Sequence, residues 1–134
     1  MSFLSKDALL AAAAQPLPVE RVEVPELDGH VFVRGMSGSE RDAWERSLFI
    51  GRGKRREFDG TNVRARLAVK CLVDETGTRL FADSEAGALG KLRVDVLQRI
   101  FETAQRMSGV TDEDIDELKK ASETAEAGSE SVSS

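Results

Sequence analysis

Side chains suited to acid–base or nucleophilic chemistry are few in this sequence and stand far apart. The chain has one histidine, His30, next to an expected turn, and one cysteine, Cys71, on the apolar face of an expected helix. A general base needs a nucleophile and an orienting group within hydrogen-bond reach, and no serine lies in a nucleophile-elbow sequence. We therefore interpret His30 as an exposed turn residue and Cys71 as a small buried apolar side chain, and we expect no enzyme activity.

The sequence gives no sign of a metal or phosphate site either. One Cys and one His cannot make a zinc site. The acidic run at residues 112–114 lacks the central Gly and terminal Glu of an EF-hand loop, and it suits the start of a helix instead. The glycines fit neither a dinucleotide-binding motif nor a P-loop. We expect no cofactor and no metal.

A basic loop is the one concentrated chemical feature. Residues 51–60, GRGKRREFDG, hold four cations close to Phe49 and Phe58, namely Arg52, Lys54, Arg55 and Arg56. Cations mixed with aromatic side chains occur in RNA-binding segments and in segments that dock on proteins. A solvated loop whose two aromatic side chains lie in the core is the third interpretation. All three stay open at this point.

Candidate contacts with a partner come from this loop and from the helix expected before it. Trp44 is the only tryptophan, and its helical spacing fits a core position as well as an interface anchor. Leu48 lies one turn further along the same helix face. We expect partner contacts from Trp44, Leu48, Phe49, Arg52, Arg55 and Arg56.

A hairpin and a helix are expected to position the loop. Valines in residues 19–24 and 31–33 flank Asp28-Gly29, a favoured turn, and predict an N-terminal β-hairpin. Ser37 and Glu40 have the spacing of a capping box, so a helix begins there, and a glycine at position 51 is its expected end.

Further helices are expected to supply the core. Residues 62–73 are apolar around most of the helical circumference, apart from an expected wet edge at Arg66 and Lys70, so this helix should be central. Residues 93–108 have an amphipathic stripe. Residues 74–77 predict a turn, with a short extended pair on either side of it.

Caps mark the remaining helices. Asp83 is expected to cap a short helical piece, and Thr111 a last helix with Asp114 at its third position. Ser5 caps a short alanine-rich helix, which Pro16 stops.

Length and composition are those of one globular domain with tails. The chain has 134 residues, of which 40% are hydrophobic and 32% charged. We expect a mobile N-terminal helix and linker at 1–18, a single α+β domain at 19–120 and a disordered acidic tail at 121–134. The fold class is α+β, predominantly helical. No segment is apolar enough to span a bilayer, so we expect no membrane association, and the lone cysteine suits a reducing cytosol.

Charge is distributed unevenly along the chain. The formal net charge is −5. Residues 111–134 contain eight acids and two lysines, which leaves the preceding body near +1. A nucleic-acid binder normally has a strongly basic body, so nucleic acid is the weaker expectation for the loop at 51–60.

The order of these elements resembles a known family. The hairpin VEVPELDGHVFVRG leads into SGSERDAWE, and LVDETGTRLF follows. The closing segment LQRIFETAQRMSGVTDEDIDEL gives a helix, Ser-Gly and an acidic capped helix. Over residues 17–118 the chain is similar to the tail assembly chaperones of long-tailed, non-contractile bacteriophages, in particular the group related to those of HK97 and lambda.

This resemblance implies a non-catalytic protein of the infected cell's cytoplasm that is absent from the mature virion. It implies binding to the tape measure protein, which is kept soluble until tail tube subunits polymerise around it. A longer product, made by a ribosomal frameshift, would recruit the tail tube protein. The alternative, from a different class, is a small nucleic-acid-binding regulator that uses the loop at 51–60. The resemblance maps no binding residue, and it leaves a homo-oligomer open.

Overall fold

The computed structural model describes residues 2–51 and 53–121, apart from the side chain of Lys54. The larger of its two sheets has three strands. Strands β1 (Val19–Val24) and β2 (Gly29–Arg34) pair antiparallel, as the valine spacing predicts. Strand β5 (Leu72–Val73) pairs with the other side of β2, which gives the order β1-β2-β5. The inward-facing valines of the hairpin are buried, so its apolar face forms one wall of the core.

The hairpin connection differs from the expected two-residue turn. Val24 lies opposite Gly29, and the residues between them form the 3-10 helix η1 (Pro25–Leu27) followed by Asp28. Pro25 fits the first position of such a turn because its φ is already helical and its missing N–H is not needed there. Asp28 alone takes a left-handed conformation, with φ of 54°.

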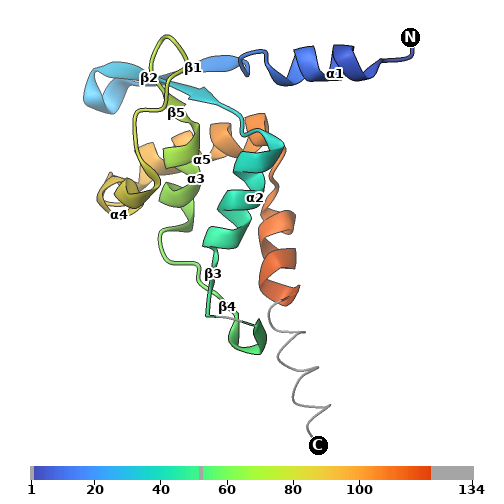
Figure 1. Cartoon of the computed structure of the whole chain (residues 1–134). Helices are drawn as coiled ribbons and strands as arrows, with labels where there is room; N and C mark the ends of the chain where they lie inside the picture. The colour runs from blue at the N-terminus through green and yellow to red at the C-terminus, as the bar shows by residue number, and fades with distance from the viewer. Residues whose placement is uncertain (1, 52, 122–134) are drawn as a thin grey trace, which may run out of the picture.

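The helices α2 (Gly38–Ser47), α3 (Val63–Cys71) and α5 (Val94–Ser108) lie on one side of the sheet, below it in Figure 1. The capping box of α2 is confirmed: the Glu40 amide donates to the Ser37 hydroxyl, and the Ser37 amide donates to the Glu40 carboxylate. The stripe of α5 is confirmed except at Val94, which is 70% exposed. The buried residues of this helix are Val96, Leu97, Ile100, Phe101 and Ala104. The mixed, largely helical α+β class is therefore correct.

Helix α3 is central, as predicted, but shorter than expected. Leu72 and Val73 leave the helix and pair with Val33 and Phe32 of β2. The free edge of β2 supplies backbone partners there, and that tertiary pairing overrides the helical periodicity of the sequence. The turn at residues 74–77 is confirmed, and beyond it Arg79 forms an isolated bridge with Val73.

Two other local expectations are wrong. Lys70 is buried, with 7% of its surface exposed, instead of lying on a wet edge. Its ammonium pairs with Asp83 at 2.9 Å, and Arg79 pairs with the same carboxylate. Asp83 therefore does not cap the short helical piece formed by η3 (Asp83–Glu85) and α4 (Ala86–Leu89), because its carboxylate is engaged by the two cations.

The last described helix covers residues 112–121. Thr111 and Asp114 cap it reciprocally through each other's backbone amides, as the sequence predicts. Val110 is buried, and Ile115 and Leu118 pack against the core. Ala121, where the disordered tail at 121–134 is expected to begin, is still helical, and residues 122–134 lie outside the described residues.

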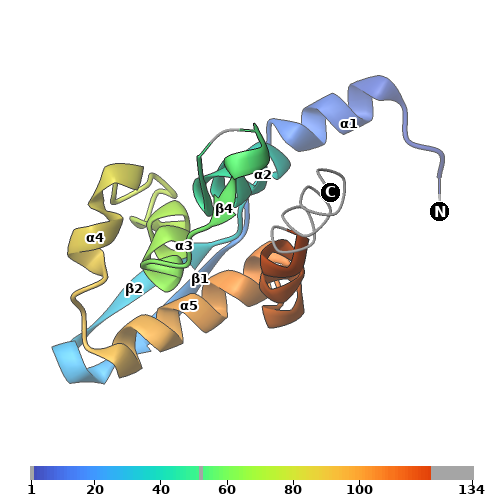
Figure 2. The same ribbon diagram turned by 90° about the horizontal axis from the view of Figure 1, so that it is seen from below.

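The N-terminal helix α1 (Lys6–Ala13) stands apart from this body. Ser5 caps it through the Ala8 amide, as expected. None of its residues is buried, and it extends away from the sheet and the other helices in both views (Figures 1 and 2). No helix within the described ranges has the length and apolar character needed to cross a membrane.

Candidate functional site

A small second hairpin carries the basic loop. The chain leaves α2 at Ser47, well before the expected end at position 51, and continues into β3 (Phe49–Ile50), which pairs with β4 (Glu57–Phe58). The intervening residues include the 3-10 helix η2 (Gly53–Arg55). Gly51 has φ of +89°, and a Cβ there would lie 2.3 Å from the Arg55 carbonyl oxygen, so this tight connection needs glycine. The hairpin lies at the end of the molecule away from the three-stranded sheet (Figure 1).

The aromatic side chains of this hairpin pack on each other. The rings of Phe49 and Phe58 meet edge to face, with centroids 5.9 Å apart, and both are half-buried against the core. The Arg56 guanidinium lies 4.1 Å from the Phe49 ring centroid, in a cation–π arrangement. The two aromatic side chains therefore lie partly buried at the edge of the core, and the Phe49 ring orients a cation on the surface.

Arg66 fastens the base of the hairpin to α3. Its guanidinium donates to the backbone carbonyls of Ser47 and Asp59 and pairs with the Asp59 carboxylate at 2.8 Å. The hydrogen bond from Arg66, helped by Thr61, lowers the pKa of Asp59 to about 2. Sequence reasoning placed Arg66 on a wet edge. The only sign of this ion pair in the sequence is that Asp59 lies seven residues before Arg66. The fold brings the two side chains together, because the segment before α3 turns back onto that helix.

The six residues expected to contact a partner do not form one surface. Trp44 and Leu48 have no exposed surface and belong to the core. Phe49 is half-buried, whereas Arg55 and Arg56 are exposed. Arg52 lies outside the described residues. The helical spacing of Trp44 and Leu48 thus reports the core face of α2, and the surface part of the expected site consists of Phe49, Arg55 and Arg56.

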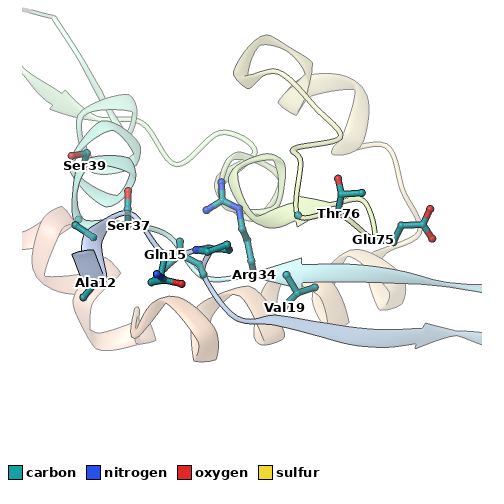
Figure 3. Close-up of a pocket in the computed structure, with 13 residues that line it drawn as sticks. Ala12, Gln15, Val19, Arg34, Ser37, Ser39, Glu75 and Thr76 are labelled. Atoms are coloured by element: carbon teal, nitrogen blue, oxygen red, sulfur yellow. The ribbon is translucent and has the colours of Figure 1, made fainter. Parts of the chain in front are cut away.

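An open hollow of about 780 Å³ lies where the N-terminal helix joins the body (Figure 3). One wall is made by the end of α1 and the linker after it, including Ala12, Pro16 and Leu17. The other wall is made by the first residues of α2, by Arg34 and by the turn at residues 75–77. The sequence analysis did not find this surface. The signal available was the absence of charge over residues 8–19.

The body wall of this hollow is held rigidly. Arg34 forms a bidentate pair with Glu40, with both N–O distances 2.8 Å. That hydrogen-bonded guanidinium, together with the Ser37 amide, lowers the pKa of Glu40 to about 2. The same carboxylate closes the capping box of α2, so one side chain fixes both the sheet edge and the helix start.

A second, smaller hollow of about 180 Å³ contains the pair formed by Lys70 and Asp83. Arg79 also donates to Asp83 and to the Val69 carbonyl. Hydrogen bonds from Lys70 and Arg79 lower the pKa of Asp83. Because these groups satisfy one another, the cluster is best understood as a tie between α3 and the segment before α4.

Of the two residues with nucleophilic or basic potential, Cys71 is placed as the sequence predicts, whereas His30 is exposed as expected but lies on strand β2 and not in the turn. Cys71 is buried, with its sulfur 3.7 Å from the Ser108 hydroxyl, and burial raises the pKa of this thiol to about 11. The thiol is therefore protonated at neutral pH and a poor nucleophile. His30 is exposed on β2, edge-on to Phe32. The described residues contain no group of three His, Cys, Asp or Glu side chains placed to hold a metal ion.

A comparison with known proteins identifies the family of this chain. A sequence model of the phage tail assembly chaperone family matches residues 5–125. The chain belongs to this family. A comparison with curated proteins finds no match.

A solved structure supports the same fold for this tail assembly chaperone. The tail assembly chaperone of bacteriophage HK97 is similar, with a TM-score of 0.54 and 20% sequence identity. The alignment covers 81% of this chain and 100% of the other. At this identity the likeness concerns the fold. Chaperone function requires surfaces that hold another protein, and in the described residues the exposed candidates are the basic hairpin and the hollow beside α1.

Proposed function

We propose that this chaperone binds the tape measure protein of its phage and keeps it soluble while tail tube subunits assemble around it. Membership of the tail assembly chaperone family is the observation that carries the proposal. The protein would act without catalysis in the cytoplasm of the infected cell and be absent from the mature virion. A frameshift-extended form would recruit the tail tube protein.

The distribution of apolar side chains supports this role. The body buries its own core, including Trp44 and Leu48, and therefore folds around a complete interior. Large apolar side chains are nevertheless exposed in the N-terminal segment, among them Phe3, Leu9 and Leu10. A chaperone for an apolar partner needs this combination, a stable scaffold with exposed apolar contacts that tube subunits can later displace.

We assign the polar part of the contact to the basic hairpin. Phe49, Arg55 and Arg56 offer an aromatic edge and cations to acidic side chains of the partner, and Arg52 belongs to the same segment of sequence. Trp44 and Leu48 are buried in the core against which the two phenylalanines of the hairpin pack, so their replacement would act through the fold. Arg55→Glu should weaken binding modestly at low salt, because exposed charge pairs are screened. Arg64→Glu, at an exposed arginine of α3, is the matched control.

Co-expression with the tape measure protein tests the proposal. We expect the two proteins to elute together in size-exclusion chromatography at low and high salt, and the tape measure protein to precipitate when expressed alone. Separate elution at both salts, with the tape measure protein soluble alone, would contradict the proposed function.

A nucleic-acid-binding regulator is the second candidate, favoured only by the exposed cations of the basic hairpin. Phosphate contacts release counterions, so such binding would weaken steeply between low and moderate salt. A salt titration with labelled RNA and DNA distinguishes the two functions, because contacts made by apolar side chains persist at high salt.

A further inference from the structure

The N-terminal arm, defined as residues 2–16, contributes nothing to the core. All its residues are exposed, and Phe3, Leu4, Leu9 and Leu10 each expose more than half of their surface. Helix α1 has eight residues, whereas isolated helices shorter than about 12 residues are marginal in water. A helix of this length with two exposed leucines, preceded by an exposed phenylalanine and a further exposed leucine, is the form expected of an element that becomes stable against a partner.

The chemistry of the arm indicates what covers it. No charged residue occurs from Ala8 to Val19, although 32% of the whole chain is charged. Such a surface does not match an acidic peptide or a nucleic acid; it matches an apolar face. The alanines at positions 11–14 have small side chains, which allow the backbone of a second helix to approach closely. An apolar helix face is therefore the best-fitting occupant.

A second copy of this chain fits the arm less well. An eight-residue helix is about 12 Å long, and two arms packed together would bury far less than the ~800 Å² per partner of a stable complex. The other large apolar side chains that are more than half exposed in the described body lie singly on different elements: Leu27 on η1, Ile50 on β3 and Val94 on α5. Single exposed apolar residues are ordinary surface and form no groove for the arm of another copy.

The hollow at the root of the arm extends the same surface. Ala12, Pro16 and Leu17 continue the apolar wall of the arm, and Ser37, Ser39 and Thr76 belong to the other wall of the hollow. Figure 3 labels Ala12 and the three hydroxyl-bearing residues. An occupant lying here meets apolar carbon on one side, and on the other hydroxyl groups together with the charged side chains of Arg34 and Glu75. This two-sided character matches an amphipathic helix, with its apolar stripe on the arm and its polar edge toward α2.

We propose that the N-terminal arm and the hollow at its root grip an amphipathic helix of the tape measure protein. This inference rests on the proposed function and names the surface that performs it. Each contact is small and therefore weak on its own. Many such contacts along one long helical partner would hold it firmly through multivalency, yet each can be displaced in turn by tube subunits.

Binding of charge-substituted variants to the tape measure protein tests this assignment. Leu9→Asp and Leu10→Asp should each weaken binding to the tape measure protein by about tenfold, because a carboxylate would be buried without a partner. Leu27→Asp and Leu80→Asp are matched controls at exposed leucines of the body and should bind as the wild type does. Circular dichroism melts check that all four variants keep the fold of the body.

The outcomes separate this inference from the proposed function. If the wild type and both arm variants bind equally well, the arm is not the gripping element, although the proposed function stands. If the wild type itself fails to bind, the proposed function fails first. Light scattering of the chaperone alone gives the third outcome: an oligomer that the arm variants dissociate would show that the arm's occupant is a second copy, which would overturn the assignment.

Discussion

Helices α5 and α1 both carry large apolar side chains, but those of α5 are mostly buried and those of α1 are exposed. In α5 the apolar residues recur every three or four positions, with charged residues between them, and five of them are buried. In α1 the leucines and alanines follow one another directly, and no residue is buried. A helix with an apolar stripe on one face and charged residues on the other packs its apolar face against the core of its own chain, because the charged face must stay in water and the apolar face is more stable out of it. A short helix without a charged face has no such commitment and is left for another molecule.

The same truncation in both helices gives the largest expected difference. Leu97→Ala in α5 removes a buried side chain and should lower the free energy of unfolding by about 2–5 kcal/mol. Leu10→Ala in α1 should change it by less than about 0.5 kcal/mol, because the side chain is 59% exposed. Urea unfolding followed by tryptophan fluorescence measures both. Similar losses would show that α1 is packed on the body in solution.

Helix caps give a smaller effect of the same kind. Glu40→Ala removes the capping box of α2 and the partner of Arg34, and should lower the free energy of unfolding by about 1–2 kcal/mol. Ser5→Ala removes the cap of α1. It should leave the global unfolding transition unchanged and reduce only the helical signal in far-ultraviolet circular dichroism. A shift of the global transition by Ser5→Ala would contradict the independence of the arm.

Acid should weaken the body and not the arm. The hydrogen bond from Arg34 lowers the pKa of Glu40 from 4.5 to about 2. A carboxyl with a lowered pKa stabilises the fold above its ordinary value, and this stabilisation is lost as the pH falls from about 4.5 toward 2. The hydrogen bond from Arg99 lowers the pKa of Glu26 in the same way, so this carboxylate also stabilises the fold above its ordinary pKa.

The measurement is the urea midpoint between pH 6 and pH 2.5. The wild type and a chain lacking residues 1–15 should lose stability in parallel as the pH falls, because Glu26 and Glu40 both lie in the body. The urea midpoint of Glu40→Gln should change less with pH. An equal dependence in Glu40→Gln and the wild type would show that this carboxylate does not titrate with folding.

Removal of residues 121–134 should have the smallest effect. These residues contain one large apolar side chain, Val132, and cannot supply much apolar burial. We expect the melting temperature to change by less than about 1 °C. A drop of several degrees in a thermal melt would mean that this segment packs on the body.

Expectations based on local chemistry were confirmed where nearby residues decide the structure. The capping boxes at Ser37 and Thr111, the cap at Ser5 and the stripe of α5 each involve groups within a few positions of one another. The protonated, buried state of Cys71 follows in the same way from its place on an apolar helix face. The family resemblance was confirmed because it rested on the order and spacing of these same elements.

Expectations were wrong where a segment distant in the sequence supplies a backbone hydrogen-bond partner or an opposite charge. The periodicity predicts helix at Leu72 and Val73, but in the structure these residues pair with the edge of β2. The helical spacing predicts an exposed Lys70, but its ammonium pairs with Asp83, thirteen residues further along the chain. Trp44 and Leu48 fit an anchor as well as a core residue, because helical spacing tells which residues share a face and not what covers that face.

The sequence by itself therefore determined where the main helices lie, the caps at Ser5, Ser37 and Thr111, the N-terminal hairpin and the family, because these depend on short-range spacing and hydrogen bonding. Tertiary structure alone decided which apolar face is covered and which is left free. It joined β5 to the sheet, buried Trp44 in the core and left the side chains of the N-terminal arm exposed. Burial is a property of the whole chain, since a face loses its water only when another segment reaches it.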